Sequence, residues 1–140
     1  MFWDSSAVVP SLLREAHSTV MAELLRSDTA AVLWWVSPVE CQSALYRRRR
    51  DKSLTERELE VALLRLRSLT DNVDVIIPTV KVRDRAGRLL AAYALSGADA
   101  LQLAAALAWC EEEPRSSGFV CLDLRLREAA HREGFTILPA

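Results

Sequence analysis

The segment AVLWWVSPVE, residues 31–40, carries the strongest structural signal in the chain. Its first six residues are all apolar and include β-branched and aromatic side chains, a composition typical of a strand buried on both faces of a sheet. Ser37 and Pro38 end this run, and Ser37 is suited to cap a helix that has Pro38 at its first position and Glu40 at its third. The segment therefore predicts a buried strand followed directly by a helix.

The same alternation continues on both sides of this segment. Short apolar runs that suit strands alternate with longer stretches whose apolar residues recur with helical spacing. The expected strands cover residues 1–3, 31–36, 73–77, 119–122 and 135–138, and the expected helices cover 5–26 with a break near His17, 37–50, 54–69, 79–95, 98–113 and 125–132. Strands that alternate with helices predict an α/β fold with a mainly parallel sheet and helices on both of its faces.

Bulk composition limits the class of protein. The chain has 140 residues, of which 51% are hydrophobic, so we expect one domain over residues 1–140 with a substantial core. The 18 basic and 19 acidic residues give a net charge of −1, which does not suggest a general nucleic-acid coat but does not exclude local binding. The three cysteines form no CxxC pair, and we interpret them as buried thiols. We expect a soluble cytoplasmic protein, because we find no signal peptide and no apolar run as long as a membrane span.

Four acidic residues have apolar neighbours and either follow an expected strand or open the expected helix 98–113. They are Asp4, Glu40, Asp99 and Asp123. Ligand sites of open parallel sheets lie beyond the carboxyl ends of the strands, so we expect all four to reach one edge of the sheet. Several inward carboxylates repel each other, and a hard cation such as Mg²⁺ or Mn²⁺, which prefers oxygen ligands, removes that penalty. The pattern therefore indicates a site for a divalent metal.

Helix capping is the alternative explanation of these four residues. Each lies near the N-terminus of an expected helix, where capping and the helix dipole favour a carboxylate. Ser37 and Glu40 match a capping box, and Ser96 and Asp99 match a weaker version of it. Taken singly, each residue fits a cap better than a metal ligand, whereas four at one sheet edge favour a metal site.

Two tryptophans and two histidines have structural explanations. We expect Trp34 and Trp35 in the core, one on each face of the sheet, rather than as a platform for stacked bases. His17 and His131 lie in charged helical stretches, so we expect them on the surface rather than in acid–base catalysis.

Four short motifs are spread over the whole chain. They are DSSA at residues 4–7, SPVE at 37–40, SGADALQLA at 96–104, and FVCLD at 119–123 with Leu126 and Ala129-Ala130 after it. In their order and spacing they resemble the motifs of PIN domains, and within that family those of VapC-type toxin ribonucleases. The sequence departs from the usual pattern at Cys121, where Thr or Ser is frequent, and at Gln102, where His is common. The resemblance implies a three-layer α/β/α sandwich with a mainly parallel five-stranded sheet.

The resemblance also implies the composition of the site. Asp4, Glu40 and Asp99 would be the core metal-binding carboxylates, with Asp123 as the fourth. Ser6 would be a supporting hydroxyl that hydrogen-bonds within the site. The bound ion would be Mg²⁺ or Mn²⁺.

The implied activity is hydrolysis of RNA phosphodiester bonds by a metal-dependent endoribonuclease, the toxin of a toxin–antitoxin pair. The implied partners are an RNA substrate, a cognate antitoxin and a second copy in a homodimer, with no membrane. An alternative is a PIN-like module that binds an antitoxin or RNA with weak or no nuclease activity. Exposed aromatic or leucine residues within 8–25 and 54–69 are candidate contacts for the antitoxin, although most residues there suit core packing. The basic run of Arg47, Arg48, Arg49 and Arg50 either contacts RNA or only ends a helix in solvent, and the sequence leaves both interpretations open.

A nucleotide-binding or phosphotransfer domain fits the sequence less well. Neither GxGxxG nor GxxxxGK[ST] occurs, and four glycines leave little room for a phosphate-binding loop. A receiver-like domain also clusters carboxylates at a sheet edge but needs a lysine after a late strand, and Lys52 and Lys81 are badly placed for that role.

Overall fold

Five parallel strands form the centre of the molecule in the computed structural model, which describes residues 1–13 and 18–140. The strands are β1 (Phe2–Trp3), β2 (Val32–Trp34), β3 (Asp74–Ile76), β4 (Gly118–Val120) and β5 (Thr136–Leu138). Their order across the sheet is β3-β2-β1-β4-β5, and every neighbouring pair is parallel. The prediction of an α/β fold with a parallel sheet is confirmed.

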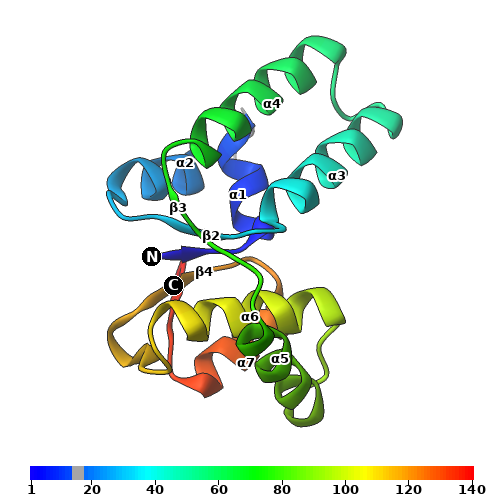
Figure 1. Cartoon of the computed structure of the whole chain (residues 1–140). Helices are drawn as coiled ribbons and strands as arrows, with labels where there is room; N and C mark the ends of the chain where they lie inside the picture. Colours follow the sequence, from blue (N-terminus) through cyan, green and yellow to red (C-terminus); the bar gives the residue numbers. More distant parts are fainter. Residues whose placement is uncertain (14–17) are drawn as a thin grey trace.

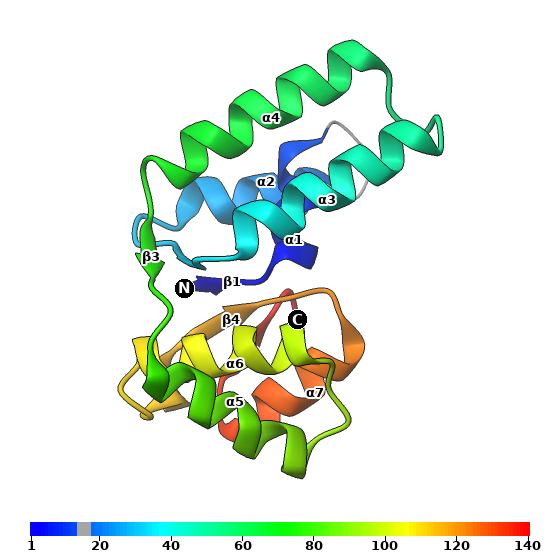
Figure 2. The same ribbon diagram turned by 45° about the vertical axis from the view of Figure 1, so that its right-hand side comes forward.

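Helices cover both faces of this sheet. They are α1 (Ser5–Leu12), α2 (Ser18–Ser27), α3 (Ser37–Arg50), α4 (Glu56–Thr70), α5 (Val80–Ala92), α6 (Gly97–Trp109) and α7 (Leu124–Glu133), with a short 3-10 helix, η1 (Pro114–Ser116), before β4. Helices α1 to α4 lie on one side of the sheet and α5 to α7 on the other (Figures 1 and 2). Each face has its own cluster of buried apolar side chains, so the three-layer arrangement is also confirmed.

The path of the chain changes direction at β1. From β1 the chain continues to β2 and β3 on one side of the sheet and then returns to β4 and β5 on the other. The carboxyl end of β1 is therefore a topological switch point, the place where open α/β sheets bind ligands. Asp4 directly follows β1 and so lies at this point.

Helix α6 packs on several sides, as its nearly all-apolar sequence predicted. It contacts α5, α7 and β2, and each residue from Leu103 to Leu107 is at most 1% exposed. It ends at Trp109, four residues before the predicted end. Glu111 and Glu112 have positive φ angles of 54° and 64°, a conformation that cannot continue a right-handed helix.

The segment with the two tryptophans requires two corrections. Strand β2 ends at Trp34, which is 3% exposed, whereas Trp35 lies in the turn after it and is 58% exposed. The predicted core position of Trp35 is therefore wrong, because the strand is too short to carry it onto the opposite face. Ser37 does not cap α3 as predicted: the N-cap is Val36, without a side-chain hydrogen bond, and the Ser37 hydroxyl donates to Gln102 Oε1 at 3.3 Å.

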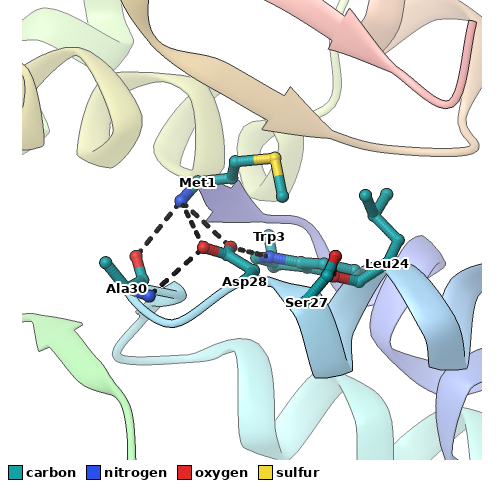
Figure 3. A network of polar contacts seen from close by, with 6 residues as sticks. All are labelled: Met1, Trp3, Leu24, Ser27, Asp28 and Ala30. Atoms are coloured by element: carbon teal, nitrogen blue, oxygen red, sulfur yellow. Dashed lines mark hydrogen bonds and ion pairs between the residues drawn. The ribbon is translucent and has the colours of Figure 1, made fainter.

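Asp28 is a largely buried carboxylate that the sequence did not single out. Its side chain is 7% exposed, although both of its neighbours in the sequence are polar. Its oxygens accept hydrogen bonds from the amino group of Met1 (3.2 Å), from Trp3 Nε1 (2.8 Å) and from the backbone N–H of Ala30 (3.2 Å) (Figure 3). These contacts lie at the amino edge of the sheet, and they satisfy the carboxylate without a metal ion.

Several smaller predictions can also be compared with the structure. Cys41 and Cys121 are buried, as expected, and Cys110 is half-buried. His131 is exposed, as expected, whereas His17 lies outside the described residues. No single helix in the described ranges is long and apolar enough to cross a membrane, and the bent pair α5 and α6 passes that test only when both helices are taken together. The single domain stays a prediction.

Candidate metal centre

The elements that carry the four predicted carboxylates all meet the carboxyl edge of the sheet. Asp4 follows β1 and caps α1, and Glu40 lies in the first turn of α3. Asp99 lies in the first turn of α6, and Asp123 caps α7. Asp123 is three residues beyond β4 rather than directly after it, because that strand ends earlier than predicted.

Asp4 is buried, with 5% of its surface exposed. Its Oδ2 accepts hydrogen bonds from the backbone N–H of Ser6 (2.9 Å), from the Ser6 hydroxyl and from the Cys121 thiol (3.5 Å). Removal from water raises the pKa of the Asp4 carboxyl, the hydrogen bonds oppose that rise, and the negative charge of Asp99 adds to it. Burial outweighs the hydrogen bonds, so the ionised form of Asp4 is held at a cost.

Glu40 is subject to the same effects. Burial is the largest cause of its raised pKa, followed by the negative charge of Asp4, with a smaller contribution from Asp99. A hydrogen bond with the Ser5 side chain acts in the opposite direction. The negative charges of Asp4 and Asp99 thus both act on Glu40. All three carboxylates stand at the starts of helices at this edge of the sheet, and we refer to Asp4, Glu40 and Asp99 as the three-carboxylate group.

Asp99 and Asp123 are both engaged at helix N-termini, as the capping alternative predicted. Asp99 Oδ2 accepts from the Ser96 hydroxyl (2.7 Å) and the Ser96 N–H (3.4 Å), and the Asp99 N–H donates back to the Ser96 hydroxyl (3.1 Å). This is the complete capping box, although the sequence ranked it below Ser37 and Glu40. Asp123 is exposed, and its Oδ1 accepts from the backbone N–H of Leu126 at 2.9 Å. Its charge is not among those that act on Asp4 and Glu40.

Ser6 ties the start of α1 to the loop after β4. Its hydroxyl donates to Asp4 Oδ2, accepts from the backbone N–H of Leu122 (2.9 Å) and lies 3.6 Å from Cys121 Sγ. The geometry agrees with the supporting hydroxyl that the family resemblance implies. It holds one oxygen of Asp4 in a fixed position.

Two further side chains lie near this loop, of which the sequence marked Cys121 only as a departure from the family pattern and did not mark Arg127. The Cys121 thiol contacts Asp4 itself, and its spacing two residues before Asp123 was the available signal. The Arg127 guanidinium donates to the backbone oxygens of Cys121 (2.7 Å), Leu138 (3.3 Å) and Pro139 (2.7 Å). Arg127 therefore fixes the loop between β4 and α7 against the end of the chain. No sequence motif signals such a contact with backbone carbonyls.

The chemistry of the three-carboxylate group suits a hard divalent cation. Every hydrogen bond described on Asp4 and on Asp99 falls on Oδ2, so Oδ1 of each is left for another partner. None of the three carboxylates takes part in an ion pair within the described ranges. No three His, Cys, Asp or Glu side chains there are already arranged to hold an ion. By type and by charge the oxygen donors fit Mg²⁺ or Mn²⁺, although their present spacing in the described residues does not yet form a metal-binding cluster.

An open groove of about 560 Å³ extends from Glu40 between α1 and α3. Ser5 and Ser6 line it near the carboxylates, and Arg47 and Arg48 line it two turns further along α3. The members of the basic run 47–50 therefore have different surroundings. Its first two members share a groove with Glu40, whereas Arg49 pairs with Glu56 at 2.8 Å.

Comparison with known proteins gives concordant results. A family model for the PIN domain matches residues 1–131. Two relatives, Ribonuclease VapC45 of Mycobacterium tuberculosis strain CDC 1551 / Oshkosh and Ribonuclease VapC49 of strain ATCC 25618 / H37Rv, are each 33% identical over 142 residues, which cover 100% of this chain and 95% of theirs.

The fold agrees with these relationships. The crystal structure of Mycobacterium tuberculosis VapC20, described as a sarcin-ricin loop cleaving toxin, superimposes with a TM-score of 0.69 at 18% identity. The match covers 96% of this chain and 95% of that one. From the family match and the two relatives together, the chain belongs to the PIN-domain family and, within it, to the VapC ribonucleases.

Proposed function

We propose that this protein is a Mg²⁺- or Mn²⁺-dependent endoribonuclease that hydrolyses RNA phosphodiester bonds and acts as the toxin of a toxin–antitoxin pair. The observation that carries the proposal is the three-carboxylate group at the switch point of the sheet. Burial, with a further contribution from neighbouring negative charges, raises the pKa of Asp4 and of Glu40, and the group has no cationic partner among the described contacts. The names of the two ribonuclease relatives support the type of reaction.

The chain's own residues would hold the ion and keep its ligands in place. Asp4, Glu40 and Asp99 would be the ligands, with Asp123 as a fourth. A bound divalent ion would polarise a phosphoryl oxygen and lower the pKa of an attacking water. The hydrogen bonds from Ser6 restrain Asp4 in advance of binding, so less ordering is needed when the ligands engage.

The groove between α1 and α3 gives a path for the RNA backbone. Arg47 and Arg48 line it beyond Glu40, so phosphates bound there would continue toward the three-carboxylate group. Guanidinium groups bind phosphate with planar, paired hydrogen bonds and without regard to sequence. This placement favours an RNA contact for these two residues over a role limited to the helix end.

Cleavage of RNA by metal-binding variants tests the proposal. Asp4→Asn and Asp99→Asn each remove a negative charge from the group, and we expect Mn²⁺-dependent cleavage of a structured RNA to fall about 100-fold or more, since even the loss of a residue that supports a metal ligand costs 10–100-fold. Asp84→Asn is the matched control, because Asp84 is an exposed residue of α5 paired with Arg83. Cleavage should be measured with Mn²⁺, with Mg²⁺ and with EDTA.

Two results would contradict the proposal in different ways. Cleavage at equal rates by wild type and both variants would exclude the three-carboxylate group as the site. Binding of RNA by the wild type without metal-dependent cleavage would instead favour the alternative, a PIN-like binding module with weak or no nuclease activity.

We further propose a cognate antitoxin as a protein partner, and assembly as a homodimer. Most apolar residues within 8–25 and 54–69 are core, but Val20, Val61 and Leu64 are 57%, 38% and 69% exposed and are candidate contacts. Co-expression with the protein encoded beside it, followed by measurement of the mass of the complex, tests both proposals. An unbound monomer in that preparation would contradict them.

A further inference from the structure

Gln102 is a polar side chain in the middle of α6, a helix that is otherwise apolar after Asp99 in its first turn. Its neighbours on α6, including Leu103 and Ala104, belong to the core, and Gln102 itself is only 1% exposed. Burial of an amide is costly unless its donor and acceptor both find partners. The partners of Gln102 therefore indicate what this residue does.

The Gln102 amide joins two separate elements to α6. Its Nε2 donates to the backbone oxygen of Trp3 at 3.2 Å, and its Oε1 accepts from the Ser37 hydroxyl at 3.3 Å. Trp3 is the last residue of β1, and Ser37 is the first of α3. Helices α3 and α6 lie on opposite faces of the sheet (Figures 1 and 2), so the amide links both outer layers to the central strand.

These three elements are the ones that carry the three-carboxylate group. Asp4 directly follows Trp3, Glu40 lies one helical turn after Ser37, and Asp99 lies one helical turn before Gln102 on the same side of α6. Each carboxylate is thus within one helical turn, or one residue, of Gln102 or of one of its two hydrogen-bond partners. An apolar residue would fill the same space but would not fix the distances between the elements.

The distribution of buried polar groups supports this interpretation. The structure describes four buried polar residues, and three of them, Asp4, Ser37 and Gln102, lie in this region. A fully hydrogen-bonded polar contact between layers specifies one arrangement of those layers, whereas apolar packing tolerates small shifts.

We propose that Gln102 is a positioning residue that sets the spacing of Asp4, Glu40 and Asp99 for a divalent ion. This inference rests on the proposed function. The Trp3 carbonyl and the Ser37 hydroxyl hold the amide, and the amide holds α3 and α6 at fixed distances from β1. The role is indirect, since Gln102 itself contacts none of the three carboxylates in the described hydrogen bonds.

Calorimetric titration of the full chain with Mn²⁺, without RNA, tests the proposal. Gln102→Met keeps nearly the same length and volume but removes both hydrogen bonds, and we expect its Kd for Mn²⁺ to rise about tenfold or more. Leu103→Met is the matched control, a buried substitution at the next position of α6, and its Kd should stay within about twofold of wild type. Ser37→Ala should weaken Mn²⁺ binding less than Gln102→Met and should add little to it in the double variant.

The outcomes separate this inference from the proposed function. A wild-type chain that neither binds Mn²⁺ nor cleaves RNA overturns the proposed function and this inference with it. A wild type that binds Mn²⁺, with Gln102→Met as tight as Leu103→Met, overturns the inference alone. If Gln102→Met does not fold by circular dichroism, Ser37→Ala decides, and an unchanged Kd in that variant overturns the positioning role.

Discussion

A buried carboxylate without a cationic partner costs free energy, and Asp4 is in that position. Its hydrogen bonds from Ser6 and Cys121 offset part of the cost, yet its pKa remains raised. Asp28 is the useful contrast, because it is also largely buried but its Oδ2 lies 3.0 Å from the positively charged amino nitrogen of Met1. At the residue scale, both acids are buried, and what distinguishes a structural acid from a candidate metal ligand is therefore whether a cationic group pairs with it.

The raised pKa of Asp4 predicts the effect of neutralising it. A carboxyl whose pKa is higher in the folded than in the unfolded state binds more protons when the protein is folded. Its contribution to stability is therefore fully present below the unfolded-state pKa, and it is lost as the pH rises through the folded-state pKa. At pH 7 without metal, Asp4→Asn should therefore raise the melting temperature, by about 2–4 °C for each kcal/mol recovered. Differential scanning calorimetry in EDTA measures this.

Two comparisons complete that experiment. Asp123→Asn is the control, because Asn caps a helix as well as Asp does and the residue is exposed, so its melting temperature should not change. Added Mn²⁺ should stabilise wild type but not Asp4→Asn. A lower melting temperature for Asp4→Asn in EDTA would show that its negative charge stabilises the fold and would argue against a metal ligand.

At the element scale, the type of nearly every element was predictable from the sequence, whereas its ends and caps were less so. Apolar periodicity is a property of the chain, and it located α4 and α6 within a few residues. Whether Ser37 caps a helix depends on which hydrogen-bond partner its hydroxyl finds in the fold, and here the hydroxyl donates to Gln102. The exposure of Trp35 likewise depends on where β2 ends. Local patterns cannot encode such long-range contacts.

The site was predictable to a similar extent. Apolar neighbours and a place after a strand or at the start of a helix selected Asp4, Glu40 and Asp99, which the structure places at the carboxyl edge of the sheet. The same criteria selected Asp123, whose side chain is described only as a helix cap. Flanking residues do not determine the direction of a side chain, so the sequence could not distinguish a candidate metal ligand from a helix cap.

The groove between α1 and α3 leads to a prediction about salt dependence. Replacing both Arg47 and Arg48 with Gln should lower the slope of log Kd against log salt for single-stranded RNA by about 0.7 for each phosphate that these side chains neutralise in the wild type. Arg49→Gln is the matched control, because Arg49 pairs with Glu56 and does not line the groove. Filter binding at several salt concentrations measures the slopes. Equal slopes for the double variant and wild type would place the RNA path elsewhere.

At the scale of the whole molecule, the strand order places the candidate site. Because the chain runs from β1 outward to β3 and then returns to β4, the carboxyl end of the central strand opens between two layers of helices. Helices α1, α3 and α6 begin at that edge, each with a carboxylate within its first turn or at its cap. The topology thus gathers at one edge charges that are far apart in the sequence.

Anomalous diffraction from a crystal soaked in Mn²⁺ tests most directly whether Asp4, Glu40 and Asp99 together bind a divalent ion. We predict an anomalous peak between these three side chains, within about 2.0–2.4 Å of at least one oxygen of each. A crystal of Asp4→Asn should show no such peak. A peak at another place, or none at this edge in the wild type at millimolar Mn²⁺, would contradict the assignment of these carboxylates as a metal centre.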